Sequence, residues 1–293
     1  ECIQSVLDQN ISFNYEILIA DDASADNTNG VIEQFAIENP QTIKPILRKR
    51  NVGCPFNGLI NWRRAKGKYI AILDGDDYWT EPYKLQKQVD YLEANPSLSC
   101  CATRFNEIEN NVIKKTLFPN HENIIKHDLK SVLNSNWSPI QTLTMVFRTD
   151  ILKPKLHLLR NQRIYAGDYT VTVLLALKGD IHVLPDNTGN KRVDSGGVWE
   201  SLHDSLKCRK LIETMDETSK FIPHKYKKLV AARIIHHADY LLLNVATNGR
   251  DLFKTSMFLL KLHLRNIRLV SLCFQYLLNY SKVKLGRFKP HLF

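Results

Sequence analysis

Residues 72–80 read Ile72-Leu73-Asp74-Gly75-Asp76-Asp77-Tyr78-Trp79-Thr80. The apolar segment that leads into this run, residues 69–73, has the length and β-branched content of a buried strand. Three carboxylates at the end of such a strand repel one another unless a cation or a polar ligand lies between them. Carboxylate oxygens suit Mg2+ or Mn2+, and in enzymes these ions usually also hold a substrate phosphate. The sequence therefore predicts a metal site made by Asp74, Asp76 and Asp77, with a solvated acidic turn as the alternative.

Helices and strands alternate along the first part of the chain. Expected strands cover residues 16–20, 43–47 and 69–73, and expected helices cover residues 1–9, a segment that ends near 38, and residues 56–66 and 81–94. This alternation predicts an α/β fold, with βαβ units and a mostly parallel sheet that helices cover on both faces. We expect strands 16–20 and 69–73 to lie in the same sheet.

The acidic residues of the first part follow two of these expected strands. Asp21 and Asp22 come directly after the first strand, and Asp74 to Asp77 follow the third. Ligands of such sheets bind beyond the carboxyl ends of the strands. We therefore expect both acidic loops to face one pocket.

The positive charge of the chain is concentrated near its C-terminus. The net charge is +10, and residues 205–293 hold 17 basic and 5 acidic residues. A nucleic-acid-binding protein with a uniformly basic surface would not have this distribution, so no nucleic-acid partner is expected. The charge pattern predicts a catalytic domain over residues 1–205 and a helical, basic region over residues 206–293.

The C-terminal region contains a long, leucine-rich and basic segment. Residues 252–280 have the pattern of an amphipathic helix, and a basic tail continues to residue 289. Such a helix can lie in the headgroup plane of an anionic membrane, and packing against the catalytic domain is the alternative. No segment reaches the roughly 18 apolar residues of a spanning helix.

The six cysteines have neither the spacing of a zinc site nor that of a disulfide framework. Cys100 and Cys101 lie side by side in an apolar segment. We interpret the cysteines as buried thiols in a reducing compartment.

Several segments of the chain match known sequence motifs. Residues 21–28 read DDASADNT, and residues 65–79 read AKGKYIAILDGDDYW. Between them lies Asn51-Val52-Gly53, and further along come GDY at 167–169, GDI at 179–181 and RVDSGGVWES at 192–201. In this order the segments resemble motifs of the family 2 glycosyltransferases of bacteria, among them DDGSxDxT and the segment that contains the metal-binding DxD. The resemblance covers about residues 1–205 and implies a fold of the GT-A type.

The beginning of the chain also resembles a family segment. Family members open with a strand, then a loop, then a helix similar to ECLxSVLxQ, and this chain starts at Glu1 with ECIQSVLDQ. The resemblance implies that the first strand and its nucleotide-contacting loop lie upstream of residue 1.

The resemblance also implies roles for individual residues. Asp76, with Asp74 or Asp77, would hold Mn2+ or Mg2+ on the diphosphate of the donor. Asp168 would be the general base that takes the proton of the acceptor hydroxyl, with a helix N-cap as the structural alternative. The remaining expected donor contacts are Asp21 and Asp22, at the base or ribose, and Asn51, Asp74 and Arg192.

Two positions depart from the family pattern. Lys191 stands where relatives usually have tyrosine, and Asp194 stands where they have histidine. A carboxylate is a harder metal ligand than imidazole, but a further anion there opposes phosphate. Asp194 is therefore only a weak candidate ligand.

The family resemblance implies transfer of a sugar from a nucleotide donor, UDP-linked, to a saccharide or a lipid-linked saccharide. It implies a cytoplasmic location, at the inner face of the membrane. A degenerate module that binds nucleotide or polysaccharide without turnover is one alternative. A phosphatase of the haloacid dehalogenase type is another, although Tyr78 stands where its motif has threonine or valine.

Overall fold

The structure is a computed structural model of the 293-residue chain. It describes residues 1–116, 122–135, 138–161, 163–193, 197, 199, 201–245 and 257–258. The chain forms two compact units, residues 1–200 and 201–293.

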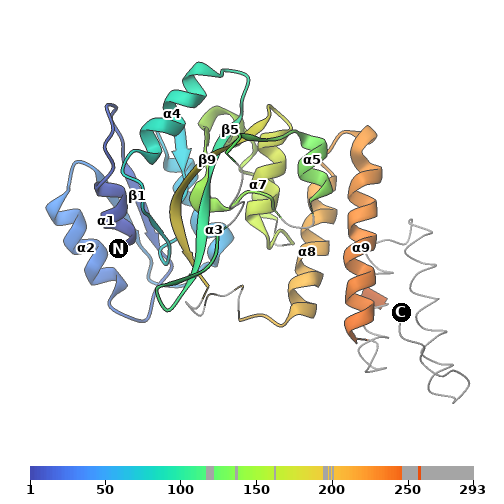
Figure 1. Ribbon diagram of the computed structural model, residues 1–293. Coiled ribbons are helices and arrows are strands. Elements are labelled where there is room, and N and C mark those ends of the chain that lie inside the picture. Colours follow the sequence, from blue (N-terminus) through green and yellow to red (C-terminus); the bar gives the residue numbers. More distant parts are fainter. Residues whose placement is uncertain are drawn as a thin grey trace, which may run out of the picture. The chain divides into compact units, whose positions relative to one another are not determined.

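The first part of the N-terminal unit alternates helices and strands, as the sequence predicted (Figure 1). Its elements are α1 (Cys2–Leu7), β1 (Ile17–Asp21), α2 (Thr28–Glu38), β2 (Ile43–Leu47), α3 (Cys54–Arg64), β3 (Tyr69–Ala71), β4 (Tyr78–Trp79) and α4 (Lys84–Ala94). Every helix and strand expected within residues 1–94 is present, with bounds shifted by a few residues. The prediction of a mixed α/β fold is confirmed.

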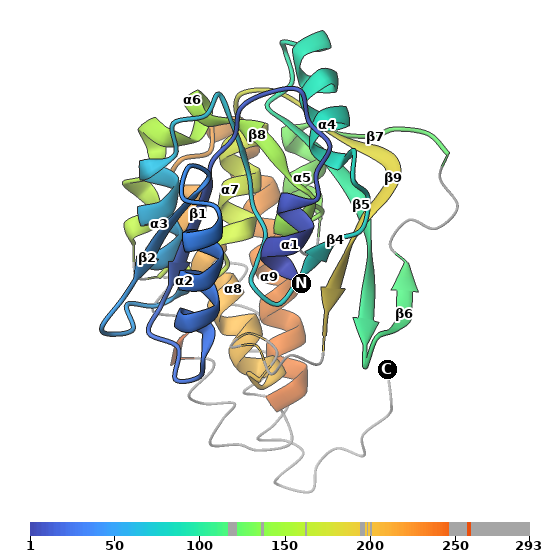
Figure 2. The same ribbon diagram turned by 90° about the vertical axis from the view of Figure 1, so that its left-hand side faces the viewer.

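The second part of this unit contains the long strands of the sheet. Its elements are β5 (Cys100–Glu109), β6 (Val112–Thr116), β7 (Ile125–His127), α5 (Leu129–Asn134), η1 (Thr142–Thr144), β8 (Val146–Arg148), α6 (Thr149–Leu152), η2 (Lys153–Lys155), η3 (Leu158–Arg160), α7 (Gly167–Ala176) and β9 (Ile181–Arg192). Strands β5 and β9 run side by side through the middle of the unit (Figures 1 and 2).

The expectation of a mostly parallel sheet is wrong. The described strands form a parallel pair, β1–β2, and a sheet in the order β3-β8-β5-β9-β4, with β6 on β5 and β7 on β9. In the larger sheet only β5 and β9 pair in parallel. A two-residue turn joins β5 to β6, where Asn110 and Asn111 have positive φ angles of 50° and 61°. Such a turn reverses the chain without a crossover helix, so the alternation of the first 94 residues does not continue.

The expectation that strands 16–20 and 69–73 share a sheet is also wrong. β3 pairs with β8, and β1 pairs with β2. On the edge of β1 that faces away from β2, the carbonyl oxygens of Leu18 and Ala20 accept hydrogen bonds from the side-chain amides of Asn61 (3.2 Å) and Asn57 (2.7 Å). These α3 side chains satisfy backbone acceptors that a neighbouring strand would otherwise pair.

The apolar core packs α4 against the larger sheet. The core residues there are buried to at least nine-tenths: Trp79, Leu85, Leu92, Leu98, Cys101, Val146 and Leu184. Helix α7 is buried from Tyr169 to Ala176. Because nearly the whole helix is packed, the residues of its first turn are held at a fixed place in the unit.

The cysteines are less uniformly buried than the sequence suggested. The five described ones are free thiols, and Cys100, Cys101 and Cys208 are buried as expected. Cys54 is exposed and Cys2 is half-buried, so the expectation of buried thiols is wrong for Cys54. Neither residue lies in an apolar strand: Cys54 begins α3 and Cys2 begins α1.

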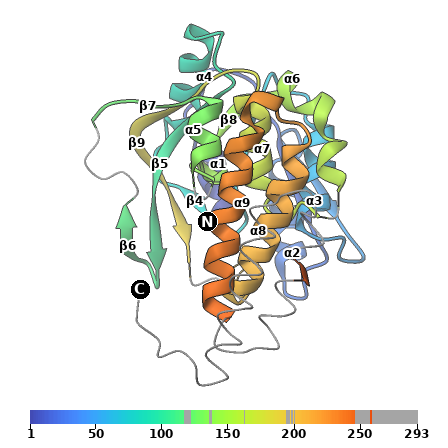
Figure 3. The same ribbon diagram turned by 90° about the vertical axis from the view of Figure 1, so that its right-hand side faces the viewer.

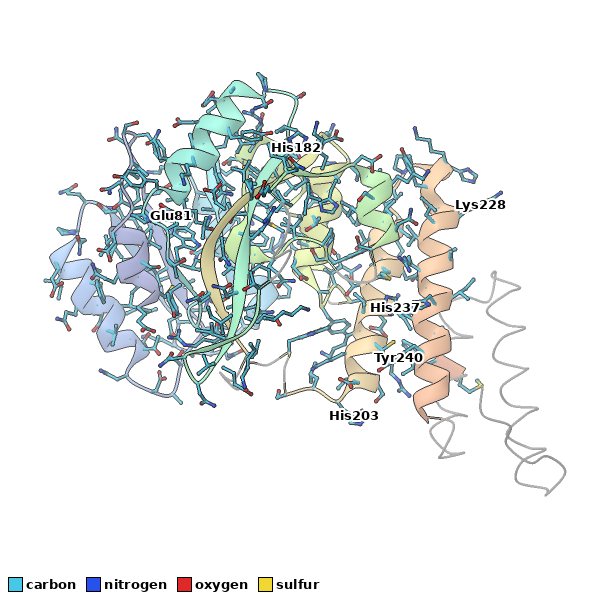
Figure 4. The ribbon with its side chains drawn as sticks, in the orientation of Figure 1. Glu81, His182, His203, Lys228, His237 and Tyr240 are labelled. Carbon is cyan, nitrogen blue, oxygen red and sulfur yellow. The ribbon has the colours of Figure 1, made fainter. Side chains whose placement is uncertain are left out.

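The C-terminal unit contains α8 (Asp204–Ser219), η4 (His224–Tyr226) and α9 (Lys227–Val245). Helices α8 and α9 lie side by side (Figure 3), and the Sγ of Cys208 donates to the carbonyl oxygen of His237, which Figure 4 labels. The described residues 204–245 are thus largely helical, in agreement with the helical region expected from residue 206 onward. None of the described helices combines the length and hydrophobicity needed to cross a membrane. The predicted membrane-binding segment, 252–289, lies outside the described residues apart from positions 257 and 258.

Candidate active site

The acidic loop after β3 is a tight turn. The N–H of Asp77 donates to the carbonyl oxygen of Asp74 (3.1 Å), which closes the turn over Gly75 and Asp76. Asp76 is exposed, whereas Asp77 is only 3% exposed. The turn therefore directs one carboxylate to the solvent and one into the protein.

Two of the three carboxylates are anchored by residues far away in the sequence. The N–H of Arg192 donates to Oδ1 of Asp77 (3.0 Å). The hydroxyl of Thr142 donates to Oδ2 of Asp74 (2.8 Å). Strand β9 and the turn η1 thus hold the acidic loop from two sides.

The carboxylates of this loop are close enough to repel one another. Burial raises the pKa of Asp77 to about 7, the charges of Asp76 and Asp74 add to this rise, and the hydrogen bond from Arg192 opposes it. The pKa of Asp74 is raised as well, because surrounding protein limits its hydration and Asp76 lies near, although the residue keeps contact with solvent. A cation placed among these groups would relieve the repulsion.

A ready-made cage for a metal ion is not found. Within the part of the chain that the structure describes, no three His, Cys, Asp or Glu side chains converge as ligands. Asp74 and Asp77 each give one oxygen to a protein donor. The residues therefore fit Mg2+ or Mn2+ only in the manner of a nucleotide site, where one or two carboxylates and the substrate's phosphates share the ion. Asp194 lies outside the described residues.

The other acidic loop, after β1, uses its carboxylates to shape the backbone. Asp21 is buried, and its carboxylate accepts hydrogen bonds from the N–H (3.0 Å) and the hydroxyl of Ser24. The carboxylate of Asp22 accepts from the N–H groups of Val52 (2.8 Å) and Gly53 (2.8 Å). Asp22 therefore ties this loop to the segment before α3.

Asn51 belongs to the same arrangement. Its Oδ1 accepts from the N–H of Gly53 (3.0 Å), and Gly53 has a φ angle of 91°, which favours glycine. Asn51 therefore helps to hold the backbone before α3, and its expected contact with the donor remains a prediction.

Cys54 lies near both acidic loops and near Asp168, the residue expected to be the general base. Although Cys54 is exposed, its pKa is raised mainly because the surrounding protein limits the hydration of the thiol, and then by the charges of Asp74, Asp22, Asp168 and Asp76. All four carboxylates therefore lie in the neighbourhood of this one residue at the start of α3.

Asp168 lies in the first turn of α7. The N-cap of this helix is Ala166, which makes no side-chain capping bond, so the alternative role of Asp168 as an N-cap is wrong. Asp168 is half-buried, and limited hydration is the main cause of its raised pKa; the charge of Asp74 also raises it. The charge of Lys191 lowers the pKa of Asp168, Asp74 and Asp77. The ammonium group of Lys191 therefore favours the ionised form of all three carboxylates.

Arg192 is held beside the acidic loop. Its guanidinium donates to the carbonyl oxygen of Asp76 (2.7 Å), forms an ion pair with Glu1 and lies 4.9 Å from the ring centre of Tyr78. The adjacent Lys191 reaches in a different direction, and its Nζ donates to Oε1 of Gln141 (3.4 Å).

The sequence analysis did not identify Cys54 or Thr142 as part of this region. It also did not predict that the positive charge of Lys191 acts on the carboxylates. Thr142 is 68 positions from Asp74 along the chain, and no local pattern marks it. Lys191 was noticed only as a departure from the family pattern.

The chain is similar in sequence and fold to several known proteins. The family model described as "Glycosyl transferase family 2" matches residues 1–153. An uncharacterised protein of Mycobacterium tuberculosis H37Rv, Rv1520, is 33% identical over 218 residues, which are 73% of this chain and 61% of that one. The chain thus spans less than two thirds of this relative's length.

Two further proteins are similar over different extents. The Escherichia coli enzyme named UDP-Glc:alpha-D-GlcNAc-diphosphoundecaprenol beta-1,3-glucosyltransferase WfaP is 36% identical over 91 residues, 31% of this chain and 34% of that one. The crystal structure of Staphylococcus aureus TarS (residues 1–349) with UDP has a TM-score of 0.55 and 17% identity, covering 100% of this chain and 89% of that one. The latter similarity shows a shared GT-A fold, as expected from the sequence. This fold and the match to the family model over more than half of the chain show that the protein belongs to glycosyl transferase family 2.

Proposed function

We propose that the protein transfers a sugar from a nucleotide-diphosphate sugar, with UDP as the nucleotide, to a saccharide or lipid-linked saccharide acceptor. The observation that carries this proposal is the grouping of Asp168 with the acidic loop, Asp74 to Asp77, around Lys191 and Cys54. The printed name of WfaP, which includes UDP-Glc and a diphosphoundecaprenol acceptor, and the UDP in the TarS structure support the choice of donor and acceptor.

In this reaction Asp168 is the general base. It takes the proton of the acceptor hydroxyl as that oxygen forms its bond to the anomeric carbon, opposite the breaking bond to the diphosphate. A raised pKa makes a carboxylate a stronger base, and the nearby charge of Lys191 favours the ionised form of Asp168. Attack from the opposite face inverts the anomeric configuration.

Asp76, with Asp74 or Asp77, is proposed to hold Mn2+ or Mg2+. The ion would neutralise the diphosphate as it leaves with the bonding electron pair. Asp74 and Asp76 are exposed, whereas Asp77 is buried, and Asp74 gives only one oxygen to Thr142. These two residues are therefore the first candidates for ligands.

The donor's nucleoside is proposed to lie along the other acidic loop. Asp22 and Asn51 hold the backbone of residues 51–53, and Asp21 holds the turn before α2. We assign these three residues to shaping the nucleoside site. Arg192, whose guanidinium lies at the acidic loop, is assigned to the phosphates.

A panel of nucleotide sugars tests the proposed function. The full chain with Mn2+ is expected to release UDP from one UDP-sugar in the presence of a saccharide or polyprenyl-diphosphate-saccharide acceptor, and EDTA is expected to stop the release. Binding of a nucleotide sugar without transfer or hydrolysis would instead support the alternative, a degenerate binding module.

We also propose that residues 252–289 bind the anionic inner face of the cytoplasmic membrane. The support is the excess of basic residues in the last third of the chain, each worth about 1 kcal/mol near an anionic leaflet. Liposome co-sedimentation of the full chain and of a version that ends near residue 250 tests this. The full chain is expected to bind anionic liposomes more strongly, and salt is expected to weaken that binding. Equal binding of both forms would contradict the proposal.

A further inference from the structure

The turn η1 lies between the acidic loop and the buried core. On one side of the turn, the hydroxyl of Thr142 donates to Oδ2 of Asp74 (2.8 Å). This is the one side-chain hydrogen bond to the Asp74 carboxylate that involves the described residues. The orientation of Asp74 therefore depends on where η1 holds Thr142.

On its other side, η1 is fixed by two buried side chains. The indole Nε1 of Trp79 donates to the carbonyl oxygen of Leu143 (2.8 Å), and Nε2 of Gln88 donates to the carbonyl oxygen of Thr144 (2.9 Å). Both donors belong to the core that packs α4 on the sheet, where Trp79 is 6% exposed and Gln88 has no exposed surface. Buried hydrogen bonds of this kind hold a backbone in one place, because leaving either partner unpaired is costly.

The amide of Gln88 is itself fixed. Its Nε2 also donates to the carbonyl oxygen of Cys101 (2.7 Å), and its Oε1 accepts from Nζ of Lys84 (2.6 Å). These contacts set the amide orientation, with the oxygen toward Lys84 and the nitrogen toward Thr144. Hydrogen bonds on both sides of η1, joined through its backbone, therefore connect Lys84 in α4 with the carboxylate of Asp74.

We propose that Thr142 is a positioning residue of the transfer site: its hydroxyl, held in place by the core contacts of η1, orients the Asp74 carboxylate toward the metal ion and the donor. The hydroxyl occupies Oδ2, which leaves Oδ1 of Asp74 for the ion or for a donor hydroxyl. This inference rests on the proposed function, because it assigns a role within the same site.

Three variants of the full chain test this role: Thr142→Val, Thr142→Ser and Thr116→Val. Valine removes the hydroxyl at nearly the same volume, and serine keeps it. Thr116 is the matched control, since its hydroxyl also donates to a side-chain oxygen, Oδ1 of Asn106 (2.9 Å), but it belongs to β6 and not to either acidic loop. The measurements are Mn2+ affinity by electron paramagnetic resonance, with and without UDP, KM and kcat for the UDP-sugar, and the melting temperature.

Thr142→Val is expected to weaken Mn2+ binding and to raise the KM of the donor by about tenfold, as loss of a hydrogen bond to a charged group does. Its melting temperature should stay close to that of the wild type, Thr142→Ser should restore the affinity, and Thr116→Val should change neither the affinity nor the KM. Wild-type affinity and KM in Thr142→Val would overturn the proposal. Equal losses in the valine and serine variants would overturn it too, because the methyl group and not the hydroxyl would then matter.

The proposed function can fail separately from this inference. If the wild-type chain turns over no UDP-sugar but binds Mn2+, the proposed function fails, and the Mn2+ affinities of the three variants still decide the role of Thr142. If Thr142→Val does not fold, the affinity of Thr142→Ala relative to Thr142→Ser decides it in the same way. A wild-type chain that binds no Mn2+ would overturn the inference.

Discussion

The backbone N–H of Arg192 donates to Oδ1 of Asp77 over 3.0 Å, and this bond joins the end of β9 to the acidic loop. Asp77 is almost completely buried, and the raised pKa of about 7 shows that this hydrogen bond does not compensate for burial and for the charges of Asp74 and Asp76. The loop therefore keeps a carboxylate that is costly to ionise in the folded protein.

Asp77→Asn tests this cost. The pKa of Asp77 is about 7 in the folded chain and near 3.8 in the unfolded chain, so the folded state binds a proton more tightly. Its contribution to stability is present below about pH 4 and is lost as pH rises through 7. Asparagine cannot ionise and its oxygen still accepts from Arg192. In EDTA, thermal unfolding should show the variant more stable than the wild type at pH 8 but not at pH 4.5. The same difference at both pH values would contradict the burial of an ionising Asp77.

Asp76→Asn is expected to abolish metal-dependent donor binding. An amide is a weaker ligand for a hard divalent ion than a carboxylate is, and Asp76 is exposed, unlike the buried Asp77. Isothermal titration with UDP, with and without Mn2+, measures the effect. Asp90→Asn, on the exposed side of α4, serves as the control. Unchanged Mn2+-dependent affinity in Asp76→Asn would remove this residue from the metal site.

Asp168→Asn is expected to leave donor binding intact and to lower transfer by about 100-fold or more, as loss of a general base does. Asparagine keeps the size of the side chain in the first turn of α7 but cannot take a proton. The measurements are UDP affinity and the rate of sugar transfer. A variant with near-normal transfer would show that another group is the base.

Lys191→Met is expected to move the acidic limb of the pH profile of kcat to higher pH. The charge of Lys191 lowers the pKa of Asp168, so without it Asp168 takes up a proton at higher pH and the base is lost earlier as pH falls. Lys191→Arg keeps the charge and should keep the profile, and Lys126→Met, on the exposed part of β7, should have no effect. An unshifted limb in Lys191→Met would mean that its charge does not act on the base.

The sequence predicted the helices and strands of residues 1–94 well, because their apolar periodicity and end signals are local. It did not predict the pairing of the strands. At the edge of β1 that a strand such as β3 could have joined, Asn57 and Asn61 donate to the backbone carbonyl oxygens. Such contacts between distant residues produce no periodic pattern in the sequence.

Residues of the candidate site could be predicted where carboxylates directly follow an expected strand or where a segment resembles a family motif. Asp76 and Asp168 were predicted in these two ways, and their roles remain predictions. Thr142 was not predicted, because a threonine in an apolar segment has no special pattern until folding brings it to Asp74. Asp21 and Asp22 were predicted to contact the base or ribose of the donor, and their hydrogen bonds to the backbone became visible only in the structure.

The last prediction concerns a close approach of two backbone segments behind α7. Gly179 follows this helix, and a Cβ atom there would lie 2.3 Å from the carbonyl oxygen of Ser97 and 3.0 Å from the N–H nitrogen of Ser99. Both atoms belong to the backbone that leads into β5, and the hydroxyl of Ser99 also donates to the carbonyl oxygen of Gly179 (2.9 Å). Neither segment can move without disturbing the start of the paired strands β5 and β9.

Gly179→Ala is therefore expected to lower the free energy of unfolding by about 1–3 kcal/mol, the usual cost of overpacking. Gly58→Ala is the matched control, because the added methyl would meet Trp62 at an ordinary distance of 3.6 Å inside α3. Alanine is the better helix former, so this control should be as stable as the wild type or more stable by up to about 1 kcal/mol. Urea unfolding of both variants measures the difference. A Gly179→Ala protein as stable as Gly58→Ala would show that the loops before β5 and β9 can separate freely, and Gly179 would then not be required for holding these two strands together.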